Sequence, residues 1–197
     1  KFGRRGKYLL LHLTSTNTLI VHLRMTGEIH IYGPSVEPDK HTHVTMDLDD
    51  GRVLHYRDQR KFGRLWLVPD IEPVLYRLGP EPLQDEFTPE VLGKGIHGRK
   101  AAIKALLLDQ SIVAGVGNIY ADEALFRAGI HPQKAGGSLN EAEIAALRNE
   151  IQTVLEMGIE KRGSSLQNYV RLDGMTGNFQ DEHQVFRKTG QACPLCG

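Results

Sequence analysis

The sequence has little that marks an exported or membrane-bound protein. It contains two cysteines and one tryptophan among 197 residues, and no run of 18 apolar residues. A helix that crosses a membrane needs such a run, so a helical membrane protein is excluded. The chain does not open with a basic, apolar and small-residue leader, which leaves the cytoplasm as the expected location.

Net charge is also absent, because 24 lysines and arginines balance 24 acids, and this by itself argues against a nucleic-acid partner. The distribution argues otherwise. The first 27 residues hold five cations and no acid, residues 94–104 hold four cations and no acid, and residues 65–93 hold six acids and one arginine. Segregated charges of this kind can form a basic face, or they can simply be solvated surface.

Length and composition fit an ordinary globular protein. With 40% hydrophobic and 24% charged residues, the chain suits roughly one large domain or two to three small ones. The sequence opens on Lys1 rather than methionine and stops one residue after Cys196. We therefore expect the full protein to extend beyond both ends.

Residues 8–68 are predicted to form antiparallel strands. The runs "KYLLLHL" and "TLIVHLRM" are rich in β-forming residues and are joined by the turn-like "TSTN". "HTHVTMDL" and "RVLHY" flank an Asp-Gly pair, which is a hairpin signal, and "FGRLWLV" predicts a further strand. Several short strands without a helical period indicate a sandwich or half-barrel.

Helical periodicity begins near Arg99, after a segment at 69–93 that holds five of the nine prolines and is predicted to be a linker or an extended crossing. "KAAIKALLLDQ" and "NIYADEALFRAGI" predict two helices, and a third is predicted from about Asn140 to Lys161, with Ser138 and Glu141 as a capping box. A long polar loop is predicted over Arg162–Phe179.

The cysteines, Cys193 and Cys196, end the chain in "CPLCG", which is predicted to follow a short strand. Two thiolates at this spacing in a tight turn suit one tetrahedral zinc ion. The alternative is a thioredoxin-like redox pair, which normally opens a helix after a strand. Zinc is the favoured interpretation, with two further ligands beyond Gly197 and weak zinc binding by these residues alone.

The connection "SIVAGVG" between the first two predicted helices is a second candidate site. A tight glycine-containing double turn directs backbone N–H groups at the start of the second helix, where a phosphate would bind. Asn118, directly after Gly117, is predicted to cap that helix and to donate its amide to a phosphate. The alternative is a plain helical hairpin in which Asn118 only caps.

Motifs along essentially the whole chain resemble the formamidopyrimidine-DNA glycosylase family of bacterial base-excision repair enzymes. In family order and spacing, these motifs are "RRGKYL", "HLRMTG", "HTHV", "YRDQRKFG", "LGPEPL", "KALLLDQ" and "GNIYADEALFRAGIHP". The resemblance implies a multidomain α+β fold: an antiparallel β-sandwich over 1–78, a helical domain with a helix–two-turn–helix over 79–165, and a lesion-covering loop with the start of a zinc ribbon over 166–197.

The resemblance also implies an activity. Such enzymes excise oxidised purines, such as 8-oxoguanine and formamidopyrimidines, from double-stranded DNA. The amine of an N-terminal proline, next to a glutamate, attacks C1′ of the flipped nucleotide, and the Schiff base allows β,δ-elimination. Neither residue opens this sequence, so we expect the 197 residues to bind DNA as a monomer without catalysis. A bacterial cytoplasmic, nucleoid-associated location is implied.

Roles for individual residues follow from the resemblance. Lys7 matches a catalytic lysine near the flipped nucleotide, whereas a solvated cation is its plain interpretation. Met25, Arg60 and Phe62 match residues that fill the hole left by the flipped base. An apolar side chain can wedge into the stack, and arginine can hydrogen-bond the orphaned cytosine. Without the resemblance, Met25 would be read as core and Phe62 as the first residue of a strand.

His41, Lys104 and Asn118 match further DNA contacts, and the loop Arg162–Phe179 matches the region that covers the flipped base. A metal site at His41 and His43 is not favoured, because no third ligand stands at a suitable spacing. Three other functions remain open: a pyrimidine-specific glycosylase, a non-catalytic binder of damaged DNA, and a helical or zinc-ribbon adaptor. The motifs "RDQRKFG" and "GNIYADEALF" favour the purine branch.

Overall fold

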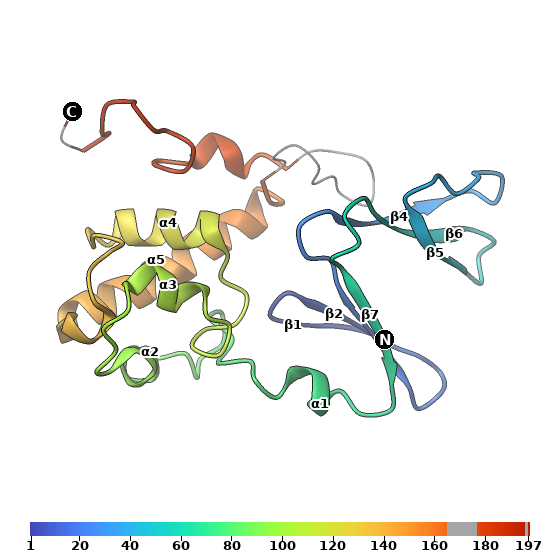
Figure 1. The fold of residues 1–197 in the computed structure, drawn as a ribbon, viewed down its shortest axis with the longest axis horizontal. Coiled ribbons are helices and arrows are strands. Elements are labelled where there is room, and N and C mark those ends of the chain that lie inside the picture. The colour runs from blue at the N-terminus through green and yellow to red at the C-terminus, as the bar shows by residue number, and fades with distance from the viewer. Residues whose placement is uncertain (165–176, 196) are drawn as a thin grey trace. The chain divides into compact units, whose positions relative to one another are not determined.

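The computed structural model describes residues 1–164, 177–195 and 197, and these form two compact units (Figure 1). Unit 1 consists of residues 1–71 and 161–180, and unit 2 of residues 72–160 and 181–197. Each unit is therefore built from two separate segments of the chain. The three domains expected from the sequence, with boundaries after residues 78 and 165, stay a prediction.

Unit 1 contains two antiparallel sheets, as the alternating apolar runs predict. The first sheet has the order β1-β2-β3-β7, with β1 Phe2–Arg5, β2 Tyr8–His12, β3 Thr18–His22 and β7 Arg64–Val68. The second has the order β4-β6-β5, with β4 Gly27–Tyr32, β5 Thr42–Asp47 and β6 Val53–Asp58. The chain passes from the first sheet to the second after β3 and returns after β6. Together with the helices of unit 2, this confirms the α+β class.

Some strand predictions were incomplete. Strands β1 and β4 were not predicted, although Ile29 and Ile31 alternate with polar residues in β4. The charged segment Phe2–Arg5 carries little β signal of its own and becomes a strand by pairing with β2. Strand β7 begins at Arg64, two residues later than the run starting at Phe62 predicts.

Unit 2 is a helical domain around one apolar core. Its helices are α1 Glu72–Leu75, α2 Pro89–Ile96, α3 Ile103–Leu108, α4 Asn118–Arg127 and α5 Glu141–Glu160. A 3-10 helix, η1, lies at Gly136–Ser138. A further 3-10 helix, η2, at Phe179–Glu182, spans the point in the sequence where unit 1 ends and unit 2 resumes. The three predicted helices are confirmed. The apolar sides of α2, α3, α4 and α5 meet in a core that includes Leu92, Leu107, Leu125, Leu147 and Ile151, all almost completely buried. No helix within the described residues is long and apolar enough to cross a membrane.

Two local predictions in unit 2 were wrong. The proline-rich segment contains α1 and α2 rather than only a linker, because Thr88 accepts the Val91 N–H at 3.3 Å and Pro89 suits the first turn of α2. The capping box of α5 is formed by Asn140 and Glu143, whose side chains each accept the other's backbone N–H, at 2.9 and 3.0 Å. Ser138 lies too early, since the first helical residue is Glu141.

The strand expected before the cysteines is also absent from the described residues 183–195. Instead, the buried carboxylate of Glu123 in α4 accepts backbone N–H groups from this segment. The donors are Gln184 at 2.8 Å, Val185 at 3.1 Å and Phe186 at 2.9 Å. A carboxylate thus satisfies the groups that a sheet would otherwise pair.

Candidate nucleic-acid interface

Two connections between the sheets of unit 1 lie side by side. The first, Leu23–Thr26, joins β3 to β4, and the second, Gln59–Gly63, joins β6 to β7 and is called here the intercalation loop. Gly27 and Asp58 are partners in the β4–β6 register, which brings the two connections together. Lys7 lies in the two-residue turn between β1 and β2, at the end of the first sheet where the rings of Tyr8 and His22 are 4.5 Å apart.

Three predicted site residues meet on these connections. Met25 is 72% exposed and Phe62 is 51% exposed. The guanidinium of Arg60 lies 4.5 Å from the centre of the Phe62 ring, and its Nη1 donates to the Met25 sulfur at 3.6 Å. This exposure contradicts the interpretations of Met25 as core and of Phe62 as a strand residue. The structure therefore presents an exposed apolar pair with an arginine between its members.

A basic cluster lies beside this pair. The Nδ1 atom of His22 accepts the Arg24 N–H at 3.0 Å. Burial, followed by repulsion from Arg24 and Lys7, lowers the pKa of His22 to about 4, so the ring is neutral at neutral pH. Partial desolvation and Arg24 also lower the pKa of the Lys7 amine, although Lys7 as a whole is exposed. Two cations held this close favour an anionic ligand.

His41 lies next to the same connections through its backbone. Its carbonyl accepts the Asp58 N–H at 3.0 Å, and the ring of His43 donates from Nε2 to the Asp58 carbonyl at 2.8 Å. The register of β5 against β6 shifts between Thr42 and Val44, which leaves His43 in a bulge. The described residues contain no group of three histidines, cysteines or acids placed to hold a metal.

In unit 2 the connection between α3 and α4, Asp109–Gly117, is called here the two-turn connection. Gly115 has a φ of 85° in the left-handed region, and Gly117 is the N-cap of α4. The prediction that Asn118 caps the helix was wrong, because Asn118 is already its first helical residue and is exposed. Lys104 is engaged by Asp122, whose carboxylate oxygens lie 2.7 and 3.0 Å from Nζ.

The two-turn connection is fixed from within. The Gln110 amide donates to the carbonyls of Leu108 and Val116, both at 3.0 Å, and its Oε1 accepts the Gly115 N–H at 2.9 Å. Four apolar residues of the connection point into the core, namely Ile112, Val113, Ala114 and Val116. The N-terminus of α4 is therefore held in a defined place within unit 2.

Comparison with known proteins identifies the fold. A model of the formamidopyrimidine-DNA glycosylase N-terminal domain matches residues 1–65, and a model of the H2TH domain of formamidopyrimidine-DNA glycosylase matches residues 78–170. The chain belongs to the formamidopyrimidine-DNA glycosylase family.

Relatives in this family resemble the chain along nearly all of its length. A formamidopyrimidine-DNA glycosylase from Pelotomaculum thermopropionicum is 47% identical over 201 residues, which cover 100% of this chain and 73% of the relative. One from Desulfitobacterium hafniense (strain DSM 10664 / DCB-2) is 50% identical over 198 residues, 98% of this chain and 72% of the relative. The chain thus spans nearly three quarters of these two relatives.

Solved structures agree with this assignment. The MutM (Fpg) protein from Thermus thermophilus superposes with a TM-score of 0.92 at 43% identity, covering 100% of this chain and 74% of that one. The Lactococcus lactis Fpg in complex with abasic-site DNA gives a TM-score of 0.91 at 38% identity, covering 100% and 73%. At these identities the likeness extends beyond the fold to the family.

The features that the glycosylase family predicts near the C-terminus are described only in part. Cys193 is partly buried and is followed by a turn at Pro194 and Leu195, and its carbonyl accepts the Gly197 N–H at 2.9 Å. Cys196 lies outside the described residues. One thiol in a suitable turn fits a zinc ligand set, and zinc stays a prediction.

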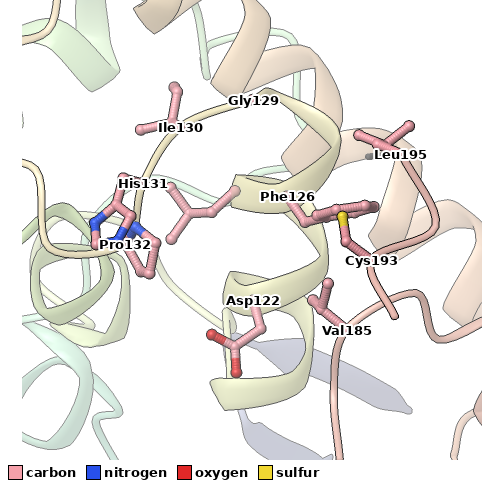
Figure 2. A pocket seen from close by; sticks show the side chains of 10 residues that line it. Asp122, Phe126, Gly129, Ile130, His131, Pro132, Val185, Cys193 and Leu195 are labelled. Atoms are coloured by element: carbon pink, nitrogen blue, oxygen red, sulfur yellow. The ribbon is translucent and has the colours of Figure 1, made fainter. Parts of the chain in front are cut away.

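A pocket of about 720 Å³ lies in unit 2 beside Cys193 (Figure 2). Helix α4, the turn after it and the C-terminal segment line the pocket, and among its residues are Asp122, Phe126, His131, Val185 and Leu195. Asp122 is already paired with Lys104. The lining is mainly apolar and lacks the convergent polar groups that recognise a base, so this pocket is not the candidate site.

Most of the predicted lesion-covering loop, residues 165–176, lies outside the described residues. Its two described ends are joined to each other. Asn178 donates its N–H to the Lys161 carbonyl at 2.9 Å, and Phe179, which is buried, donates to Gly163 at 3.1 Å. The loop therefore begins and ends at one place in unit 1.

Sequence reasoning missed two buried carboxylates, Asp58 and Glu123. Asp58 is surrounded in sequence by cations and was read only as part of the charged motif. Its position at the start of a turn is a usable signal, since aspartate often accepts hydrogen bonds from backbone N–H groups two or more residues later. Glu123 offers no such signal, because its donors lie more than 60 residues away.

Proposed function

We propose that this chain carries the DNA-binding and base-everting surfaces of a base-excision repair glycosylase and AP lyase that acts on oxidised purines, such as 8-oxoguanine and formamidopyrimidines. The observation that carries the proposal is the exposed cluster of Met25, Arg60 and Phe62 on two adjacent connections. Solved family relatives that include complexes with Fapy-dG DNA and abasic-site DNA support it.

The cluster suits the hole that a flipped nucleotide leaves in a duplex. Apolar side chains that enter such a hole offset part of the unstacking cost, which is a few kcal/mol per step. Phe62 and Met25 offer exposed apolar surface for this purpose. Arg60, between them, offers a planar set of donors that matches the edge of an orphaned cytosine.

Phosphate contacts would come from both units. Lys7 and Arg24 supply positive charge beside the cluster in unit 1. In unit 2 the start of α4, with exposed Asn118, offers backbone N–H groups and a side-chain amide. Lys104 would contribute after exchanging Asp122 for a phosphate, and His41 would contact the same groove.

The chemical step of the proposed reaction needs an amine. Attack of that amine on C1′ releases the base, and the Schiff base then permits β,δ-elimination at the abasic site. The family resemblance assigns the amine to an N-terminal proline, and the first proline of this sequence is Pro34. Lys7 would assist proton transfer, and zinc held by Cys193, Cys196 and two further ligands would stabilise the ribbon.

The binding test compares a duplex that carries a tetrahydrofuran abasic analogue with an undamaged duplex across a range of salt concentrations. We expect tighter binding to the abasic analogue, and weakening of both affinities as salt rises. Phe62→Ala should reduce the affinity for the abasic duplex by about tenfold, since stacking of an aromatic side chain on a base contributes about 1–3 kcal/mol. Phe2→Ala, another exposed phenylalanine of unit 1, is the matched control.

Equal affinity for both duplexes, or equal effects of the two substitutions, would contradict the proposal. A borohydride trapping assay on duplex with 8-oxoguanine tests the chemistry separately. We expect residues 1–197 alone to bind without forming a covalent adduct. An adduct would show that another amine, with Lys7 as the first candidate, serves as the nucleophile.

A further inference from the structure

The carboxylate of Asp58 lies at the base of the intercalation loop and is completely buried. Its Oδ1 accepts the Thr26 hydroxyl at 2.5 Å and the Arg60 N–H at 3.2 Å. Its Oδ2 accepts the Gly63 N–H at 2.7 Å and the Tyr56 hydroxyl at 3.3 Å. Burial raises the pKa of Asp58, but these four hydrogen bonds outweigh that effect and keep the pKa below its ordinary value.

Two of these bonds fix the path of the intercalation loop. Because Arg60 and Gly63 both donate their backbone N–H to one carboxylate, the loop closes around Asp58. Lys61, between them, adopts a φ of 59°, a left-handed conformation that is uncommon for lysine. A Cβ on Gly63 would lie 1.9 Å from the Tyr56 hydroxyl, so a larger residue there would have to displace the buried Tyr56 side chain. The side of the loop that faces Asp58 is polar and closely packed, whereas Phe62 on the loop is exposed to solvent.

A third bond fixes the neighbouring connection. Thr26 directly follows Met25, and its hydroxyl donates to the same carboxylate. Arg24 has a φ of 56°, and a Cβ on Gly27 would lie 2.4 Å from the Leu23 carbonyl oxygen. Asp58 therefore joins the connection that carries Met25 to the loop that carries Arg60 and Phe62.

The backbone of Asp58 extends the same arrangement to the start of β5. Its N–H donates to the His41 carbonyl, and its carbonyl accepts from the His43 ring. Thr26, Arg60, Gly63 and His41 each form a hydrogen bond with Asp58. Apart from Lys7, every residue of unit 1 that is proposed to contact DNA is one of these four or lies within two residues of one of them.

We propose that Asp58 is a positioning residue that presets Met25, Arg60 and Phe62 for insertion into the duplex before DNA arrives. The inference deepens the proposed function and rests on it. Exposed side chains cannot be held by burial, and ordering them only on binding would lower the affinity. Four hydrogen bonds to one buried carboxylate hold the backbone beneath them instead.

The test substitutes Asp58→Asn, which keeps the size of the side chain but turns one acceptor oxygen into a donor. In either orientation of the amide, this donor faces a backbone N–H, that of Arg60 or that of Gly63. The probe is a duplex with a tetrahydrofuran abasic analogue and 2-aminopurine beside the orphaned cytosine. We expect affinity for this duplex to fall about tenfold and the fluorescence change on insertion to be lost. Affinity for undamaged duplex should change less than about twofold.

The sign of the effect separates positioning from charge. Removing any acid weakens repulsion of DNA and should raise affinity slightly. Asp50→Asn removes an exposed acid that pairs with Arg52 in the hairpin between β5 and β6, and serves as the charge-matched control. Equal changes in the Asp50→Asn and Asp58→Asn variants would overturn the proposal.

A double-mutant cycle separates positioning from folding. In a Met25→Ala, Arg60→Ala, Phe62→Ala background, Asp58→Asn should cost less than about twofold in affinity for the abasic duplex, because the three side chains it positions are gone. A cost as large as in the unmodified chain would show that Asp58 acts only through folding. If Asp58→Asn unfolds unit 1, as Trp66 fluorescence would report, the same cycle is run with Thr26→Val, which removes a single donor.

The two proposals fail in different ways. If the unmodified chain does not distinguish the abasic duplex from undamaged duplex, the proposed function fails. If it does distinguish them and neither Asp58→Asn nor Thr26→Val alters the fluorescence change, only the positioning role fails.

Discussion

The intercalation loop of unit 1 turns its phenylalanine outward, whereas the two-turn connection of unit 2 turns four apolar residues inward. Phe62 is half exposed, and Ile112, Val113 and Val116 are almost completely buried. The side chains that hydrogen-bond the backbone of the two segments also differ. The ionised carboxylate of Asp58 fixes the intercalation loop, and the neutral amide of Gln110 fixes the two-turn connection.

On the proposed function, this difference follows from the groups that each segment must leave exposed to contact DNA. Burial of apolar side chains stabilises a fold by about 25 cal/mol per Å², but a side chain that will enter DNA cannot be buried in the free protein. Charge-assisted hydrogen bonds to a buried acceptor can then fix the backbone. The contact proposed for the two-turn connection uses the start of α4 and no apolar side chain, so the apolar side chains of the connection remain available for the core.

Truncation of an apolar residue in each segment should give the largest contrast. Ile112→Ala removes a buried side chain from unit 2 and should lower the free energy of unfolding by about 2–5 kcal/mol. Phe62→Ala removes an exposed one and should change it by no more than about 0.5 kcal/mol. Both free energies are measured by urea unfolding. The helical circular dichroism signal monitors unit 2, and Trp66 fluorescence monitors unit 1. A large loss of unfolding free energy in the Phe62→Ala variant would show that Phe62 is a core residue.

Acid should weaken unit 1 through His22. Its pKa is lowered from 6.5 to about 4, so the neutral ring stabilises the fold above pH 6.5, and this contribution is lost as pH falls toward 4. The full difference is on the order of 3 kcal/mol. Trp66 is the only tryptophan and lies in β7 of unit 1, so its fluorescence during urea unfolding reports the loss. In the His22→Gln variant, the free energy of unfolding of unit 1 should change less between pH 6.5 and pH 4. If it falls with pH as steeply in the variant as in the unmodified chain, the prediction is contradicted.

Removal of the Gln110 amide should have the smallest of the three effects. Gln110→Ala leaves the Gly115 N–H and two carbonyls without this partner, and we expect a loss of about 1–3 kcal/mol in unit 2. Gln110→Glu keeps the shape but directs a carboxylate oxygen at the carbonyls of Leu108 and Val116, and should destabilise at least as much. If Gln110→Glu were neutral, the amide would not be what completes the connection.

Sequence periodicity predicted the regular elements whose stabilising contacts are local. The stripe in "NIYADEALF" and the length of the third helix were sufficient to place α4 and α5. Prediction failed for strands that depend on pairing with residues outside them, and at the start of α5, where Asn140 and Glu143 form the capping box in place of Ser138 and Glu141. The charged strand β1 exists through β2, and the start of β7 at Arg64 follows from the closed loop around Asp58.

For the candidate site, sequence motifs singled out Met25, Arg60 and Phe62, because the family resemblance attaches a role to those residue types at that spacing. The sequence could not show that Arg60 lies between Met25 and Phe62, since 35 residues separate Arg60 from Met25. It also could not show that Lys104 is paired with Asp122, which depends on how α3 packs against α4.

By itself, the sequence determined the family, the antiparallel and helical halves and the identity of the residues proposed to enter DNA. These properties can be predicted from local periodicity and from short motifs. Only the tertiary structure decided that Phe62 is exposed rather than the first residue of a strand, and that Asp58 and Glu123 are buried acceptors. A buried carboxylate is stable only where donors converge on it from several segments, and that convergence exists only in the folded chain.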